Sequence, residues 1–128
     1  MIAFAGNIER GPSAFSQMLC AVDFAVGPTQ EVVIAGERAD ASAMFAALHR
    51  GFLPNKVVLF RPNTQEGEEV PLITRLAAYT KAQTALDGKP TAYVCENYTC
   101  QAPTTDISTM LAYLSGAPES AGEPEEGD

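Results

Sequence analysis

The chain has little of what most catalytic and metal sites require. Its 128 residues contain no tryptophan, one histidine and three cysteines, and 8 Lys and Arg against 16 Asp and Glu. No Gly-rich phosphate loop, serine nucleophile elbow or metal-binding His-Glu motif occurs. The sequence therefore offers no motif for a cofactor or a metal ion, and we expect none.

The negative charge is concentrated at the C-terminal end. The formal net charge is −8, and without the five acids of the terminal stretch the remaining chain carries −3. Those acids are Glu119, Glu123, Glu125, Glu126 and Asp128. No basic patch predicts nucleic-acid binding, and neither a membrane-spanning run nor a secretory signal is present. We expect a cytoplasmic protein without nucleic-acid or membrane partners, and an odd number of cysteines fits that reducing compartment.

A helical pattern opens at Pro12 and Ser13 and ends at Gly27-Pro28. Its apolar positions form one stripe that predicts a buried face: Phe15, Met18, Leu19, Val22, Ala25 and Val26. Cys20 and Phe24 lie one turn apart and point away from this stripe. We interpret Cys20 and Phe24 as candidate interface residues, which face a partner absent from this chain.

Two short apolar runs predict buried strands around a helix. Glu31 to Gly36 and Lys56 to Phe60 have the unbroken apolar character of strands covered on both faces. A helix from Ala41 to Arg50, capped by Asp40 and closed by Gly51, lies between them. Its predicted inward residues are Ala43, Met44, Ala47 and Leu48. Short connections favour a parallel pair of strands.

The second half predicts a helix, a hairpin and a last helix. Pro71 begins a helix whose apolar positions are Leu72, Ile73, Leu76 and Tyr79, with a ragged extension toward Lys89. Thr91 to Cys100 reads as a hairpin turning at Asn97-Tyr98. The final helix is capped by Thr105 or Asp106 and buries Ile107, Met110, Leu111 and Leu114. From Ser115 onward the composition predicts a disordered tail.

After the opening helix, the predicted order is strand, helix, strand, helix, strand, strand, helix. This is the element order of a thioredoxin-like α/β fold, here divided into an N-terminal segment (1–10), the domain (11–115) and a disordered acidic tail (116–128). Pro90 stands just before the third strand, where such proteins usually hold a cis peptide, so we predict a structural role and a cis bond there. No cysteine follows the first strand, so the usual redox site is degenerate.

The hairpin opposes Cys95 to Cys100 and thereby makes them the candidate catalytic residues. Three alternatives remain open for the pair: two small apolar side chains on a buried face, a labile or regulatory disulfide, or part of a metal site. A metal site would also need His49 or Cys20, which lie on separate predicted helices. His49 in the last turn of its helix is otherwise explained by the helix dipole.

Three stretches resemble the C-terminal end of the spermatogenesis-associated protein 20 family, also called thioredoxin-domain-containing proteins. They are Glu31 to Gly36, Phe52 to Val58, and Thr91 to Cys100 with the Gln101-Ala102-Pro103 that follows. The resemblance implies a longer parent with an N-terminal thioredoxin-like domain and an α/α toroid, like those of carbohydrate-acting six-hairpin proteins. It associates the parent with carbohydrate metabolism and places the expected active sites upstream of this segment.

Two functions follow as hypotheses. The first is a non-catalytic module that packs on the upstream α/α toroid and supports it. The second is a dithiol oxidoreductase module that uses Cys95 and Cys100, which requires at least one exposed sulfur of low pKa. Under the first hypothesis we predict two neighbouring, buried and largely reduced thiols.

Overall fold

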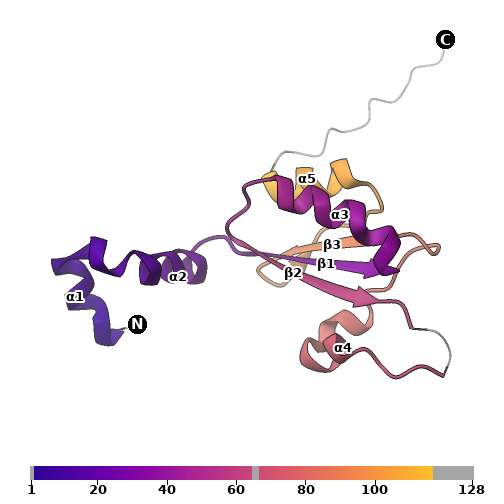
Figure 1. The fold of residues 1–128 in the computed structure, drawn as a ribbon, viewed down its shortest axis with the longest axis horizontal. Helices are drawn as coiled ribbons and strands as arrows, with labels where there is room; N and C mark the ends of the chain where they lie inside the picture. Colours follow the sequence, from indigo (N-terminus) through magenta and orange to yellow (C-terminus); the bar gives the residue numbers. More distant parts are fainter. Residues whose placement is uncertain (1, 65–66, 117–128) are drawn as a thin grey trace, which may run out of the picture.

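A computed structural model describes residues 2–64 and 67–116. The predicted tail falls almost entirely on residues 117–128 and so lies outside the described residues. The chain begins with 3-10 turns at Ile2–Phe4 and Pro12–Phe15 and with helices α1 (Ala5–Arg10) and α2 (Ser16–Val26). We call residues 2–26 the helical arm, and Figure 1 shows it extending away from the rest of the chain.

The predicted burial of the apolar stripe on α2 is wrong. No residue of α1 or α2 is buried, and Val26 at the end of α2 is 79% exposed. The predicted helical segment does form, but Pro12 begins a 3-10 turn, α2 follows from Ser16, and Gly27 ends it. Burial failed because the arm meets the remaining chain only at its last turns, so its stripe has nothing to pack against.

A four-stranded sheet forms the centre of the molecule, in the order β2-β1-β3-β4. Its strands are β1 (Gln30–Gly36), β2 (Lys56–Pro62), β3 (Thr91–Glu96) and β4 (Thr99–Cys100). β1 pairs in parallel with β2, and the pairs β1–β3 and β3–β4 are antiparallel. Element order, the parallel first pair and the final hairpin are therefore as predicted, whereas β2 is an edge strand rather than a fully covered one.

Helices α3 (Arg38–Arg50) and α5 (Ile107–Ser115) cover one face of this sheet (Figure 1). The core between them comes from alternate strand residues and from one stripe of each helix: Val32, Ile34, Ala41, Met44, Leu48, Ala92, Val94, Met110 and Leu114. The predicted cap Asp106 is confirmed, since its carboxylate accepts a 2.7 Å hydrogen bond from the Thr109 backbone N–H.

Helix α3 starts earlier than its sequence predicts. It begins at Arg38 after Glu37, so Asp40 lies in the first turn and is not the cap. Ala41 belongs to the buried stripe of the observed helix, whereas Ala43, which was predicted to face inward, is exposed. The observed spacing of Ala41, Met44 and Leu48 follows the helical repeat, which turns every third or fourth residue toward the sheet.

The opposite face of the sheet is covered by α4 (Leu72–Leu76) and a 3-10 turn at Ala78–Lys81. Here the predicted apolar face is wrong: Leu72 and Leu76 are 63% and 75% exposed, while Thr74 and Thr80 are buried. The reason is the polar lining of this face. The Nε of the buried Arg61 guanidinium donates a hydrogen bond to the Thr80 carbonyl at 3.1 Å. This bond attaches the 3-10 turn to the sheet.

The bond between Lys89 and Pro90 is trans. No cis peptide bond occurs in the described residues, so the prediction of a cis Pro90 is wrong. A trans X–Pro bond is the lower-energy form unless surrounding contacts enforce the other. Pro90 instead packs against Gly36 at the end of β1. None of the described helices is long and apolar enough to cross a membrane.

Candidate functional site

The β3–β4 hairpin holds the two candidate cysteines. Asn97 and Tyr98 form its turn with φ of 50° and 63°, the pair of left-handed residues of a two-residue type I′ turn. Gln101 N donates to Val94 O at 2.9 Å, and hydrogen-bonded pairs alternate along an antiparallel ladder. Cys95 and Cys100 therefore occupy a non-hydrogen-bonded pair, in which opposed side chains come closest.

The two sulfurs form a disulfide with an S–S distance of 1.98 Å and a Cα–Cα distance of 3.9 Å. The predicted opposition of Cys95 and Cys100 is confirmed, and of the three alternatives the structure contains the disulfide. The interpretation as two buried thiols is wrong, because Cys95 is only 5% exposed but Cys100 is exposed. The bond thus joins a buried residue to a solvent-exposed one.

Gln83 lies against the inner sulfur. Its Nε2 is 3.9 Å from the Sγ of Cys95, and its side chain is only 8% exposed. Its Oε1 is the sole buried side-chain oxygen or nitrogen without a hydrogen-bond partner in the described part of the chain. An unpaired buried carbonyl is costly, so this amide is a feature that needs an explanation.

Two hollows adjoin Cys95, and Cys100 lines neither of them. One, of about 180 Å³, is lined by Thr29, Glu31 and the hairpin tip, and the other, of about 310 Å³, lies toward Gln30 and Tyr113. Both include Cys95 and Asn97 in their walls. The first hollow is smaller than a usual ligand pocket, and the second is at the lower end of the usual range. Neither is large enough to hold a large substrate.

The disulfide lies at the opposite end of the sheet from the usual thioredoxin site. In the β1–β3 ladder Glu96 pairs with Gln30, whereas Thr91 pairs with Ala35. The start of α3 therefore adjoins Pro90, at the far end of β3 from Cys95. That position is occupied by Gly36, Glu37 and Arg38, and the Arg38 guanidinium stacks 5.4 Å from the Phe60 ring centroid. Any thiol chemistry of this chain is consequently located elsewhere than in thioredoxin.

The remaining predicted residues stay apart from the disulfide. Cys20 is a free, exposed thiol on α2, and Phe24 is half-buried in a hollow shared with Pro54 and Asn55. His49 is exposed in the last turn of α3 beside Phe45 and Phe60. Among residues 2–64 and 67–116, no group of three or more His, Cys, Asp or Glu side chains could hold a metal ion.

Sequence reasoning missed Gln83 and Arg61. Gln83 falls in the segment between the 3-10 turn and β3, where no periodicity indicates which side chain is buried. Arg61 directly follows the apolar run that predicted β2, and that run gives no signal for a buried arginine. Side chains two residues apart in a strand point to the same face, so the pattern of Val57 and Leu59 places Arg61 on their face of β2.

Comparisons with known proteins point to one family. The chain is similar to spermatogenesis-associated protein 20 of Homo sapiens, with 30% identity over 116 residues. The proteins of the same name from Rattus norvegicus and Mus musculus are 25% and 24% identical over the same length. No protein-family model and no solved structure matches the chain.

The matches cover 89% of this chain but only 14% of each relative. The relatives are thus much longer proteins than this chain. Together with the hairpin cysteines and the strand sequences that suggested it, this similarity confirms the predicted resemblance of the chain to the spermatogenesis-associated protein 20 family.

Proposed function

We propose that the chain is the non-catalytic C-terminal α/β module of a longer cytoplasmic protein, and that its helical arm holds it on the α/α toroid implied by the family resemblance. In this role the module supports the toroid, and the parent's activity in carbohydrate metabolism belongs to the upstream domains. The proposal is supported by coverage: the chain spans only 14% of the length of the human relative, as expected of one part of a longer protein.

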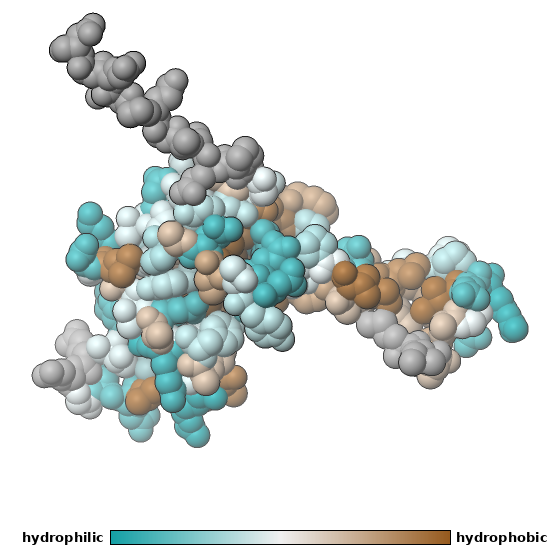
Figure 2. Space-filling model, turned by 180° about the vertical axis from the view of Figure 1, so that it is seen from behind, coloured by the Kyte–Doolittle hydropathy of each residue, from teal (hydrophilic) through white to brown (hydrophobic). Residues whose placement is uncertain are grey.

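The observation that carries the proposal is the uncovered helical arm. No residue of α2 is buried, although most of its residues are apolar. Figure 2 shows hydrophobic side chains on the surface of the arm, where Leu19 and Val26 are exposed. A soluble protein rarely leaves such a helix without a partner, because contiguous exposed apolar surface usually marks an interface.

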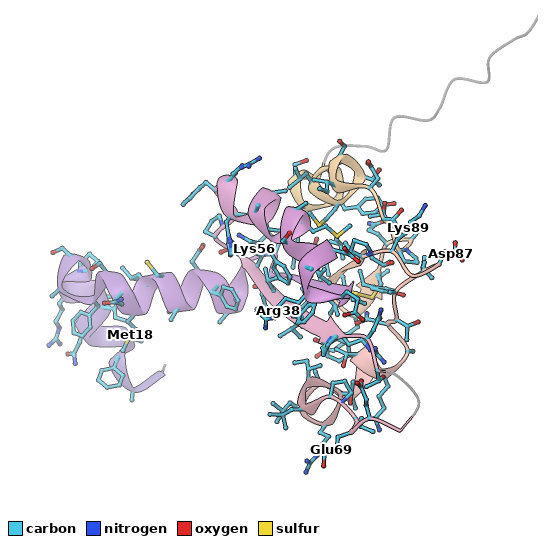
Figure 3. All side chains as sticks on the ribbon, turned by 45° about the vertical axis from the view of Figure 1, so that its right-hand side comes forward. Met18, Arg38, Lys56, Glu69, Asp87 and Lys89 are labelled. Carbon is cyan, nitrogen blue, oxygen red and sulfur yellow. A yellow bond between two sulfur atoms is a disulfide. The ribbon has the colours of Figure 1, made fainter. Side chains whose placement is uncertain are left out.

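The arm also continues into the body of the molecule on one side. Leu19, Cys20 and Phe24 line a hollow with Pro54 and Asn55, and the neighbouring Phe52 is 92% exposed. Gly27 allows this approach, since a Cβ there would lie 2.6 Å from the Asp23 carbonyl oxygen and 3.4 Å from the Asn55 side chain. In Figure 3, Met18 lies on the arm, well separated from Arg38 and Lys56. The toroid would therefore contact the arm and the loop around Phe52.

The experiment measures binding of the chain to the separately purified upstream part of the longer protein by titration calorimetry. Leu19→Ser should weaken binding by about tenfold or more, because burying a leucine side chain contributes roughly 1.5–3 kcal/mol. The same change should leave the thermal unfolding of the chain alone nearly unaltered, since Leu19 is outside the core.

Leu76→Ser is the matched control. Leu76 is an exposed leucine on α4, at another part of the surface, so its replacement should leave binding unchanged. If Leu76→Ser weakens binding and Leu19→Ser does not, the interface is on α4 and the assignment to the arm is wrong. Sedimentation of the chain alone tests whether a second copy of the chain covers the arm. Dimers that form with rising concentration and are lost in Leu19→Ser would show that it does.

A further inference from the structure

The Cys95–Cys100 bond joins the buried residue Cys95 to the exposed residue Cys100 at the edge of the sheet. β4 contains only two residues, and neither cysteine belongs to the core cluster between the sheet and helices α3 and α5. Gln101 N and the Ala92–Thr104 bridge attach the chain after the hairpin to β3 independently of the sulfurs. The bond can therefore open without unfolding the domain.

The exposure difference determines which sulfur a thiol can reach. Thiol–disulfide exchange requires a thiolate to attack one sulfur while the other departs. Only Cys100 is open to solvent, whereas Cys95 is covered. Attack on Cys100 sends the Cys95 sulfur inward as the leaving group, toward the side chain that lies behind it.

Gln83 is that side chain, and its amide suits both states of a departing sulfur. The Nε2–H group, 3.9 Å from Sγ, can donate to the Cys95 thiolate as it forms. Once this thiolate takes a proton, the thiol becomes a donor, and the unpartnered Oε1 of Gln83 can accept from it. The buried carbonyl that lacks a partner in the disulfide form thereby gains one in the reduced form.

We propose that Cys95–Cys100 is a redox-active disulfide that exchanges with small monothiols of the glutathione type, with Cys100 as the attacked sulfur and Gln83 as the positioning residue for Cys95. A monothiol thiolate bonds to Cys100 Sγ, the Cys95–Cys100 bond breaks, and Cys95 takes up one proton. A second monothiol thiolate then attacks the sulfur of the first, which releases the small disulfide and leaves Cys100 as a thiolate that is protonated. Two thiols are oxidised and one protein disulfide is reduced.

This site is independent of the arm interface proposed above, because neither cysteine of the pair lies on the arm. It also differs from thioredoxin chemistry in position, since the start of α3 takes no part. The reactants are small because the bond lies partly inside the fold, where Cys95 is only 5% exposed, and a small thiol reaches such a bond more readily than a folded protein does.

The test treats the chain, carrying Cys20→Ser to remove the third cysteine, with defined mixtures of reduced and oxidised glutathione. Acid quenching, alkylation and peptide mass mapping then identify the modified sulfurs. The expected intermediate carries glutathione on Cys100, with Cys95 protected from alkylation until the protein is denatured. Circular dichroism under the same conditions should show a folded chain throughout.

Gln83→Leu tests the positioning role. Leucine has neither the amide donor nor the unpaired carbonyl acceptor. The disulfide form is therefore stabilised, because it no longer buries an unpaired carbonyl, and the reduced form is destabilised, because Cys95 loses its hydrogen-bond partner. The ratio of squared reduced glutathione to oxidised glutathione at half-reduction should rise about tenfold. Gln17→Leu is the matched control, since Gln17 is exposed on α2 and lines neither hollow beside the pair, and its ratio should equal that of the parent chain.

Three results would overturn the proposal. The pair could stay closed until the domain unfolds, or glutathione could be found on Cys95 instead of Cys100. Equal shifts in Gln83→Leu and Gln17→Leu would remove Gln83 from the mechanism. Because the mapping is made on the unchanged pair, it remains decisive even if Gln83→Leu fails to fold.

Discussion

Gly36 and Pro90 are in direct backbone contact. A Cβ atom on Gly36 would lie 3.1 Å from the Cα of Pro90, and Gly36 has a φ of 145°. The contact joins the end of β1 to the residue before β3, at the place where thioredoxin-like proteins have their active site. In this chain no cysteine stands there, and the position before the start of α3 is occupied by Gly36 and Glu37.

Gly36→Ala should destabilise the chain by about 2 kcal/mol, because an alanine at this φ is strained and its methyl group meets backbone atoms. Chemical denaturation monitored by circular dichroism measures the loss. Gly51→Ala is the control: Gly51 has a φ of −87°, and its Cβ would contact only the Leu53 side chain at 3.6 Å. Gly51→Ala should be neutral or slightly stabilising, and an equal loss in both variants would contradict the role of the Pro90 contact.

Arg61→Lys should cost about 1–3 kcal/mol, because lysine cannot reproduce the directed bonds of a buried guanidinium. Arg61 donates through Nε to Thr80 O and through Nη1 to Pro62 O. Hydrogen exchange should show the loss as faster exchange in the 3-10 turn at Ala78–Lys81. Arg75→Lys, at an exposed position of α4, should change neither quantity. A stable Arg61→Lys variant would show that packing, rather than hydrogen bonding, holds the turn.

Tyr98→Gly should stabilise the hairpin by about 1 kcal/mol, because the left-handed conformation is strained for every residue with a Cβ. Tyr98 has a φ of 63°, and its side chain is fully exposed, so no packing is lost. Asn-Gly is also the preferred pair in this turn. Tyr98→Ala retains the Cβ and should show no gain in the urea midpoint. A destabilised glycine variant would indicate an unrecognised contact of the tyrosine ring.

Asp106 should make the stability of the chain dependent on acidic pH. Hydrogen bonds from the backbone N–H and the hydroxyl of Thr109 hold the pKa of Asp106 below its usual value. A lowered folded-state pKa means that the stabilisation is complete above the unfolded-state pKa and is lost as pH falls through the folded-state value. Asp106→Ala should therefore lower the melting temperature at neutral pH, with a difference from the parent chain that shrinks below about pH 4. A difference that is independent of pH would assign the effect to helix propensity.

Local sequence patterns predicted the elements that depend on near neighbours. The unbroken apolar run of Val32 to Ala35 is fully buried in the central strand. The turn at Asn97-Tyr98 fixed the hairpin pairing, and therefore the opposition of Cys95 to Cys100, because a two-residue turn permits one register. Asp106 capped its helix as expected, since the side chain and the N–H that it accepts are three residues apart.

Which apolar stripe is buried was decided by the tertiary structure. The stripe of α2 and Leu72 and Leu76 of α4 have the spacing of buried positions, yet they are exposed, because periodicity describes one face of a helix and not what lies opposite it. The contrast between buried Cys95 and exposed Cys100, and the arrival of Gln83 behind Cys95, likewise depend on packing between segments without a shared periodicity. The sequence by itself determined the strands, the turn and the pairing of the cysteines through short-range geometry. Only the folded chain determined which of the two cysteines is exposed to solvent, because burial depends on which surfaces pack together.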